Sequence, residues 1–193
     1  IEEEKLLGAK HGDKVIVKIV HWTENGKLCG EVTEILSGRS NYDVEMISIL
    51  CYNGIPFQFP EEVIQEAEYT NTEITDEEVK KRRDFKGITT FTIDPVDAKD
   101  FDDALSYKQL DNGNLEIGIH IADVGHYVRT GSELDKEAQK RGNSVYLADR
   151  VIPMLPEQLS NVACSLRPHE DKYCFSVVLE FDVENNIVNE WFG

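Results

Sequence analysis

The sequence predicts an α+β protein built mostly of antiparallel β-structure. Short β-branched runs separated by hairpin-type turns occur in the first 50 residues and again after residue 87. Between these runs, short segments with helix-capping residues predict helices rather than strands. The chain of 193 residues is long enough for one or two domains with a hydrophobic core.

Residues 1–55 predict part of a small β-barrel. Residues 14–22 are rich in β-branched side chains, Asn25-Gly26-Lys27 marks a turn, and residues 28–36 and 44–51 supply two further strand-like runs. Three short strands joined by turns are typical of small all-β barrels. The block is short for a complete barrel, so we expect only a part of one.

Residues 56–84 predict an acidic linker with short helices. Residues 61–78 carry eight acidic side chains and no lysine or arginine. A helix is expected over residues 61–68, directly after a proline, and a Thr-x-x-Glu capping box predicts another over residues 76–83. We interpret the region as a solvated linker between two units rather than as a ligand site.

Residues 85–193 form the second predicted unit. Residues 88–93 predict a short buried strand. Residues 101–107 and 115–121 flank an Asp-Asn-Gly turn and predict a hairpin. Within the second of these strands, alternate residues must face opposite sides of the sheet.

The remainder of this unit predicts one helix and a final hairpin. Ser132 is expected to cap the helix and Gly142 to end it. Residues 151–160 contain two prolines and predict irregular structure. Residues 174–183 and 187–192 predict the hairpin, around an Asn-Asn turn.

The net charge of −17 argues at first against a nucleic-acid-binding protein, because phosphate contacts need lysine and arginine. The charge is uneven, however. Thirteen acidic side chains lie within residues 61–78 and 94–103, and the net charge without them is −4. Each of the two segments therefore needs its own explanation.

Five of the fifteen aspartates lie between residues 94 and 103, on both sides of a bend that Pro95 imposes. A strand–loop–strand of this length can bring its two ends together. Two carboxylates ~4 Å apart repel by about 4 kcal/mol at an effective dielectric of 20, so a converging group would raise the pKa values of its members or need a cation. Oxygen ligands without cysteine favour a hard ion, Mg²⁺ or Mn²⁺.

Other interpretations of these aspartates remain open. They could form a solvated acidic loop or act as turn formers. An EF-hand loop is rejected, because the glycine that it requires is absent. The hairpin register predicts Tyr107 opposite Ile117, which places Asp102 and Asp103 beside the segment that ends at Asp123. Asp123 is therefore a further candidate carboxylate.

Several other residues have an ordinary structural explanation. His120 is expected to be packed or hydrogen-bonded rather than a ligand. Cys164, five residues before His169, is expected to be a small buried residue rather than a nucleophile. Trp22 and Tyr42 are expected to pack in a core, with stacking on bases at an OB-type barrel face as the alternative.

The four cysteines form no C-x-x-C pair, which favours a reducing cytoplasm. No run approaches the ~18 apolar residues that a membrane span needs. The chain begins Ile-Glu-Glu-Glu, so we expect no signal peptide and a piece of a longer protein. No membrane contact and no protein partner are expected.

Five motifs in order are similar to the ribonuclease II/R family: TIDPVDAKDFDDA, IHIADVGHYV, RGNSVYL, VIPMLPEQLSN and CSLRP. The aspartate motif is the most specific of them. The block with GDKVIVKI and GEVTEIL resembles the end of the cold-shock, OB-type domain that precedes this family's catalytic domain. The resemblance covers nearly the whole chain and implies a partial OB-type barrel followed by the start of a ribonuclease II-type catalytic domain.

The resemblance implies a 3′–5′ exoribonuclease that hydrolyses single-stranded RNA processively from its 3′ end to nucleoside 5′-monophosphates. The family's four motif aspartates correspond to Asp94, Asp100, Asp102 and Asp103, as catalytic and Mg²⁺-binding residues. Asp94 and Asp103 would hold the tighter ion, and Asp100 and Asp102 would orient a second ion or the attacking water. Asp97 and Lys99 occupy positions that the motif leaves variable.

Two residues are implied as RNA-binding. Tyr146 matches the tyrosine that stacks on a base near the 3′ end, with core packing as the alternative. Arg167 could contact phosphate or form an internal ion pair. Because the family's catalytic domain continues past Gly193, we expect the isolated chain to bind metal weakly and to degrade RNA poorly. A non-catalytic RNA-binding module and an acidic protein-interaction domain remain the alternatives.

Overall fold

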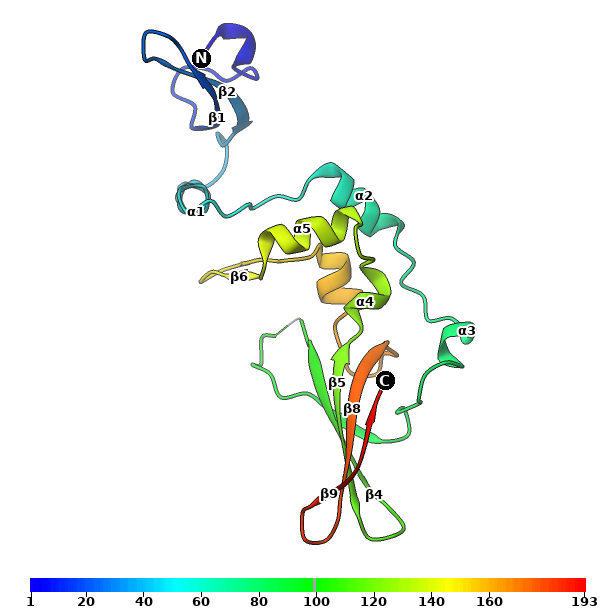
Figure 1. Ribbon diagram of the computed structural model, residues 1–193. Helices are drawn as coiled ribbons and strands as arrows, with labels where there is room; N and C mark the ends of the chain where they lie inside the picture. The colour runs from blue at the N-terminus through cyan, green and yellow to red at the C-terminus, as the bar shows by residue number, and fades with distance from the viewer. Residues whose placement is uncertain (99) are drawn as a thin grey trace. The chain divides into compact units, whose positions relative to one another are not determined.

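The structure is a computed structural model that describes residues 1–98 and 100–193; Lys99, one of the variable motif positions, lies outside the described residues. The chain divides into two compact units, residues 1–57 and residues 58–193 (Figure 1).

The first unit is built on an antiparallel ribbon. A short 3-10 helix (Glu3–Lys5) precedes β1 (Val15–Trp22), which pairs with β2 (Leu28–Ile35). Gly26 in the connecting turn has φ of +72°, a conformation that glycine adopts without a steric cost. Both strands and their turn are as the sequence predicts.

The third strand expected in this unit is wrong, because residues 44–51 belong to helix α1 (Asn41–Tyr52). The side chain of Ser40 accepts a hydrogen bond from the backbone N–H of Asp43 and so caps the helix. Val44, Ile47 and Leu50 recur every three residues and are buried on one helical face. This spacing outweighs the β-branched composition that had predicted a strand.

Trp22 and Tyr42 were expected in a core, and that expectation is also wrong. Their side chains are 67% and 50% exposed. Most of β1 is exposed as well, and the buried cluster of this unit forms instead around Leu36, Val44 and Ile47.

A five-stranded antiparallel sheet dominates the second unit, in the order β3-β4-β5-β8-β9 (Figure 1). Its strands are β3 (Thr89–Phe91), β4 (Asp103–Gln109), β5 (Leu115–Ala122), β8 (Cys174–Phe181) and β9 (Ile187–Phe192). The predicted fold class, α+β with mostly antiparallel strands, is confirmed. β3 is an exposed edge strand, however, and not the buried strand that the sequence predicts.

The register of the β4–β5 hairpin is as predicted. Tyr107 pairs with Ile117 and Asp103 pairs with Ile121. The backbone N–H of Ala122 donates to the carbonyl of Asp102 at 3.0 Å, which extends the pairing by one residue. The Asn-Gly turn and the two-residue alternation fix this register from the sequence.

The small and polar side chains of β5 face the interior, whereas Ile119 and Ile121 lie exposed on the opposite face. His120 is 3% exposed, and its ring nitrogens lie 2.8 Å from the hydroxyl oxygens of Ser106 and Ser176. The expectation of a packed, hydrogen-bonded histidine is therefore confirmed. At Gly118, a Cβ atom would lie 2.6 Å from the ring of His120.

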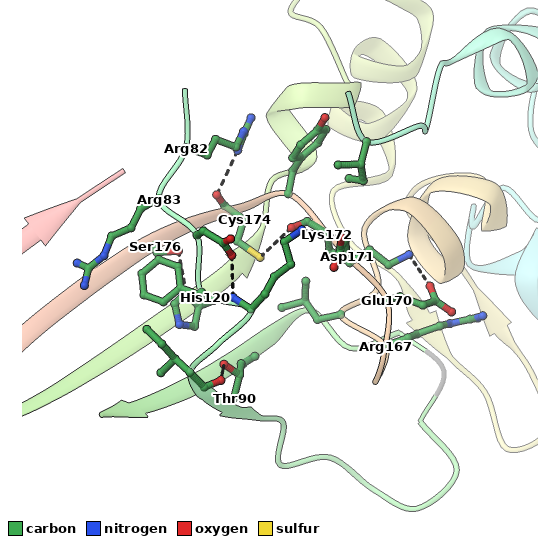
Figure 2. A pocket seen from close by; sticks show the side chains of 18 of the residues that line it. Arg82, Arg83, Thr90, His120, Arg167, Glu170, Asp171, Lys172, Cys174 and Ser176 are labelled. Atoms are coloured by element: carbon green, nitrogen blue, oxygen red, sulfur yellow. Dashed lines mark hydrogen bonds and ion pairs between the residues drawn. The ribbon is translucent and has the colours of Figure 1, made fainter. Parts of the chain in front are cut away.

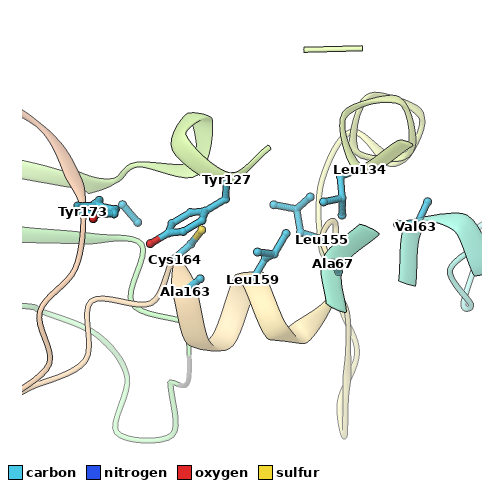
Figure 3. Packing of buried hydrophobic residues seen from close by; sticks show 10 residues of the cluster. Val63, Ala67, Tyr127, Leu134, Leu155, Leu159, Ala163, Cys164 and Tyr173 are labelled. Atoms are coloured by element: carbon cyan, nitrogen blue, oxygen red, sulfur yellow. The ribbon is translucent and has the colours of Figure 1, made fainter. Parts of the chain in front are cut away.

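The largest buried cluster of the second unit (Figure 3) contains residues of α2 (Glu61–Tyr69), α4 (Val124–Tyr127), α5 (Glu133–Arg141) and the π-helix η2 (Gln158–Ala163). Leu134 of α5 and Leu159 of η2 are fully buried, and Val63 and Ala67 of α2 pack in the same cluster. Helix α2 is therefore part of a core, and the interpretation of this region as a solvated linker is wrong for it.

The remaining helices are short. Thr75 caps α3 (Asp76–Val79) as predicted, but the helix ends at residue 79 rather than 83. Ser132 caps α5 and Gly142, with φ of +78°, follows its end, both as predicted. The sequence did not predict α4 (Val124–Tyr127), the π-helix, or the small hairpin of β6 (Val145–Tyr146) and β7 (Val151–Ile152).

A buried ion pair stabilises the end of α5. Arg141 and Glu137 approach to 2.9 Å, with side chains 3% and 6% exposed. Arg141 also donates to the carbonyls of Pro153 and Gln58, and its guanidinium lies 3.7 Å above the ring centre of Phe59.

Within residues 1–98 and 100–193, no helix has the length and apolar character needed to cross a membrane.

Candidate metal and RNA site

The four motif aspartates lie on the connection between β3 and β4. Asp94 follows β3, and the chain then turns at Pro95, whose carbonyl accepts a hydrogen bond from the N–H of Ala98 at 3.0 Å. Asp103 is the first residue of β4, and Asp102 directly precedes it. The strand–loop–strand expected from the sequence is therefore present.

The segment that follows the π-helix anchors this loop. The backbone N–H of Phe101 donates to the hydroxyl oxygen of Ser165 at 3.1 Å, and the N–H of Leu166 donates to the carbonyl of Phe101 at 2.8 Å. Phe101 stands between Asp100 and Asp102, so both neighbours are tied to a fixed backbone. Sequence reasoning missed Ser165; its place in CSLRP was the available signal.

The carboxylates influence one another. The pKa of Asp102 is raised above its usual range, first by partial desolvation of its carboxyl group and then by the negative charges of Asp100, Asp103 and Asp94. The side chain of Asp102 nevertheless remains at the surface. Among the described residues, Asp94, Asp102 and Asp103 have neither a side-chain hydrogen bond nor a cationic partner within 4 Å.

The structure does not form a closed metal cage by itself. In the described part of the chain, no three histidine, cysteine, aspartate or glutamate side chains converge as a preformed ligand set. The four carboxylates are thus close enough for their charges to interact, but they are not drawn together around one point.

Tyr146 lies at this cluster. Its hydroxyl donates a hydrogen bond to Oδ2 of Asp100 at 2.7 Å, across 46 residues of sequence. This hydrogen bond, with some desolvation and the charges of Asp100 and Asp102, raises the pKa of Tyr146 to about 12. The side chain is 63% exposed, so the alternative of core packing is excluded.

Asp123 is engaged elsewhere. Its Oδ1 accepts a hydrogen bond from the N–H of His126 as the cap of α4, and its Oδ2 lies 2.8 Å from Nη2 of Arg82. Arg82 also binds Glu78 and the carbonyl of Cys174. Asp123 therefore acts as a structural anchor, and it is not among the charges that raise the pKa of Asp102.

A cleft of about 890 Å³ lies next to the loop on the inner face of the sheet (Figure 2). It reaches Thr92 and Phe101, which lie near the two ends of the connection between β3 and β4 (the aspartate loop, residues 92–102). None of the four aspartates lines the cleft. Arg167 does line it and follows the Leu166 anchor directly. Its neighbours Lys86 and Lys172 are paired with Asp171 and Glu170.

Arg167 differs from these lysines. Arg167 is half-buried, and among the residues that the structure describes no hydrogen bond or ion pair within 4 Å involves its guanidinium group, although its charge helps to lower the pKa of Glu170. The internal ion pair considered for it is thus not formed.

Cys164 is 4% exposed, and burial raises the pKa of its thiol to about 11. A thiol of this kind is protonated at neutral pH and is a poor nucleophile. The expectation of a small buried residue is therefore confirmed.

Comparisons with known proteins agree with this architecture. Residues 82–193 match the model of the RNB domain, and residues 1–60 match that of the cold shock domain. The sheet and its acidic loop thus define an RNB domain, which follows a unit of the cold-shock type. The chain belongs to the RNB family, whose exoribonucleases are metal-dependent.

Individual relatives are similar over most of the chain. Ribonuclease R 1 of Lactococcus lactis is 44% identical over 178 residues, which cover 91% of this chain and 22% of that protein. The structure of Mycoplasma genitalium RNase R in complex with ribose-methylated single-stranded RNA matches with a TM-score of 0.80 at 30% identity, over 99% of this chain and 30% of that one.

Yeast Ssd1, described as a pseudonuclease, also matches, with a TM-score of 0.67 at 25% identity over 92% of this chain and 23% of that one. The chain spans about a quarter of the length of the ribonuclease R proteins that it resembles.

Proposed function

We propose that this chain forms part of the active centre of a 3′–5′ exoribonuclease. The enzyme hydrolyses single-stranded RNA processively from the 3′ end and releases nucleoside 5′-monophosphates. The similarity to ribonuclease R over more than nine tenths of the chain supports this reaction class. A cytoplasmic location stays a prediction.

The arrangement around Asp102 carries the proposal. Its carboxyl group is partly desolvated and lies within the field of three further carboxylates. Among the described residues, no cationic side chain lies within 4 Å of these four groups, whereas four other acidic side chains of the unit have lysine or arginine partners: Glu78, Glu116, Asp123 and Asp171. Carboxylates that have no cationic partner among the described residues fit a bound divalent cation.

We assign the cation as Mg²⁺, which Mn²⁺ can replace, because all the candidate ligand atoms are carboxylate oxygens. Asp94 and Asp103 would hold the tighter ion, and Asp100 and Asp102 would orient a second ion or the attacking water. Such ions lower the pKa of bound water and neutralise charge as the phosphodiester is displaced. Closing the carboxylates around a cation also removes their mutual repulsion.

Two side chains contact the RNA in this proposal. The exposed ring of Tyr146 offers a stacking surface for a base near the 3′ end, without selecting its identity. Arg167 contacts a phosphate, since its guanidinium group has no partner among the described residues. The RNA complexes of the Mycoplasma relative support RNA as the ligand class.

The test compares Asp103→Asn with a matched control, Asp111→Asn. Asp111 lies in the turn of the β4–β5 hairpin, away from the loop. Mn²⁺ binding, by calorimetric titration, and RNA hydrolysis are both measured with the full gene product that contains these 193 residues. We expect Asp103→Asn to abolish hydrolysis and weaken Mn²⁺ binding with an unchanged circular dichroism spectrum, and Asp111→Asn to leave both unaffected. Normal turnover by Asp103→Asn contradicts the proposal.

The second candidate is a non-catalytic RNA-binding module. The lack of a preformed ligand cage in the described residues and the similarity to a pseudonuclease favour it. It predicts RNA binding that depends on salt but not on divalent metal, and no hydrolysis by the gene product. The Mn²⁺ titration above distinguishes the two candidates.

A further inference from the structure

The ring and the hydroxyl group of Tyr146 lie in different environments. Its ring is largely exposed, whereas its hydroxyl is bound to Oδ2 of Asp100. In the hairpin of β6 and β7, Tyr146 pairs with Val151, and this pairing fixes the position of the Tyr146 backbone. A further hydrogen bond from the N–H of Leu147 to the carbonyl of Arg150, at 2.8 Å, closes the turn of this hairpin.

The hydroxyl contact is of the strong kind. A donor–acceptor distance of 2.7 Å to an ionised carboxylate is typical of a charge-assisted O–H···O⁻ bond. No other hydrogen bond or ion pair involves the Asp100 side chain within residues 1–98 and 100–193. The Tyr146 hydroxyl is thus the contact that restricts rotation of this carboxylate and leaves its second oxygen available.

We propose that Tyr146 is a positioning residue for Asp100, in addition to offering a stacking surface. Its hydroxyl orients the carboxylate toward the cation, and the same side chain receives the terminal base. Seating of the RNA 3′ end and orientation of a metal ligand are thereby linked through one residue. This inference rests on the proposed function, because it requires Asp100 to face a cation.

The physical basis is the hydrogen bonding of metal-ligating carboxylates by neighbouring groups. Loss of such a partner commonly reduces metal affinity by about 10-fold to 100-fold. Tyr146→Phe removes the hydroxyl and retains the ring, so the two roles can be separated. Because the side chain is mostly exposed, neither Phe nor Ala at this position is expected to disturb the core.

The experiment measures Mn²⁺ affinity and base stacking separately, in the full gene product that contains these 193 residues. Mn²⁺ binding is followed by calorimetry or by the electron paramagnetic resonance signal of the free ion. Stacking is followed in EDTA, by quenching of 2-aminopurine at the 3′ end of a short single-stranded RNA. Tyr69→Phe is the matched control, because Tyr69 is an exposed tyrosine at the end of α2.

We expect Tyr146→Phe to weaken Mn²⁺ binding about 10-fold to 100-fold and to leave the quenching within about twofold of the unmutated chain. Tyr146→Ala is expected to lose both. In a double-mutant cycle, Tyr146→Phe is expected to add nothing in an Asp100→Asn background. Tyr69→Phe is expected to change neither measurement.

The outcomes separate this inference from the proposed function. If Asp103→Asn weakens Mn²⁺ binding but Tyr146→Phe does not, the positioning role is wrong and the metal site stands. If the unmutated gene product binds no Mn²⁺, or Asp103→Asn has no effect on binding, the metal site and the positioning role are both wrong. If Tyr146→Phe lowers Mn²⁺ affinity equally with Asp100 present and with Asp100→Asn, the proposed coupling between Tyr146 and Asp100 is wrong.

Discussion

Ser165 and Phe101 are 64 residues apart, yet the fully buried Ser165 accepts the backbone N–H of Phe101 at 3.1 Å. With the return bond from the N–H of Leu166 to the Phe101 carbonyl, both backbone polar groups of Phe101 are fixed. Since Phe101 stands between two of the four aspartates, the segment after the π-helix determines where their carboxylates can lie.

Ser165→Ala is therefore expected to affect both stability and the aspartate loop. It leaves the N–H of Phe101 without its acceptor, which costs about 1–3 kcal/mol of unfolding free energy for a buried group. We expect weaker Mn²⁺ binding as well, measured by calorimetry beside urea denaturation.

Ser160→Ala is the control for this change, because its half-buried hydroxyl contacts the adjacent Asn161 side chain and not the loop. A Ser165→Ala variant with unchanged Mn²⁺ affinity would show that this anchor does not position the carboxylates.

Gly118→Ala is expected to destabilise the sheet. The added Cβ would lie 2.3 Å from Oγ of Ser106 and 2.6 Å from Nε2 of His120. Both of these side chains are buried and hydrogen-bonded to each other, so neither can move freely. We expect a loss of about 1–3 kcal/mol in unfolding free energy, measured by urea denaturation.

Gly87→Ala serves as the matched change, because a Cβ there meets nothing within 4 Å and the backbone φ is not positive. Its effect should stay within about 0.5 kcal/mol. Equal effects of the two substitutions would contradict the steric explanation.

Local patterns in the sequence predicted the parts of the fold that depend on nearby residues. The Asn-Gly turn fixed the pairing of Tyr107 with Ile117, and the caps at Thr75 and Ser132 fixed two helix starts. Each of these features involves groups within a few residues, for which turn and cap chemistry are specific.

Composition misled where two patterns competed. Residues 44–51 are rich in β-branched residues, but the spacing of Val44, Ile47 and Leu50 with the cap at Ser40 forms helix α1. In β5, alternation predicted two faces and could not decide which one is buried. The sheet buries Gly118 and His120, because the side chains that cover this face include Phe85 from a distant segment.

In the candidate site, too, the sequence predicted the local features but not the tertiary contacts. The aspartates were found from their density beside Pro95, a purely local signal. The contacts of Phe101 with Ser165 and of Asp100 with Tyr146 join residues 64 and 46 positions apart. Only the tertiary fold brings such pairs together, so no periodicity or spacing in the sequence could predict them.

His120 makes stability depend on pH. Burial, and then the charge of Arg83, lowers the pKa of His120 below its ordinary value of 6.5. As the pH falls, His120 therefore takes up a proton in the unfolded chain before it does so in the folded chain. The contribution of His120 to the free energy of unfolding falls as the pH drops below about 6.5. We expect the urea midpoint to decrease between pH 7.5 and pH 5.5, a window above most carboxyl titrations.

His120→Gln is expected to flatten this decrease, although part of it remains because the pKa of His126 is also lowered, mainly by burial and by Arg82. His11→Gln, at an exposed position, should leave the slope unchanged. If the urea midpoint depends on pH equally in His120→Gln and in the unmutated chain, groups other than His120 cause the pH dependence.

Glu137→Gln tests the buried ion pair at the end of α5. The change removes the carboxylate that lies 2.9 Å from the guanidinium group of Arg141, whose side chain is 3% exposed, and removing one partner of a buried ion pair costs about 3–5 kcal/mol of unfolding free energy. Arg141 also donates to the carbonyl of Pro153, directly after β7, so its displacement loosens the hairpin that presents Tyr146. We expect a large loss of unfolding free energy together with weaker Mn²⁺ binding. Glu133→Gln, which breaks the exposed pair with Lys136 in the same helix, should change neither measurement, and a similar loss from both variants would exclude a special role for the buried pair.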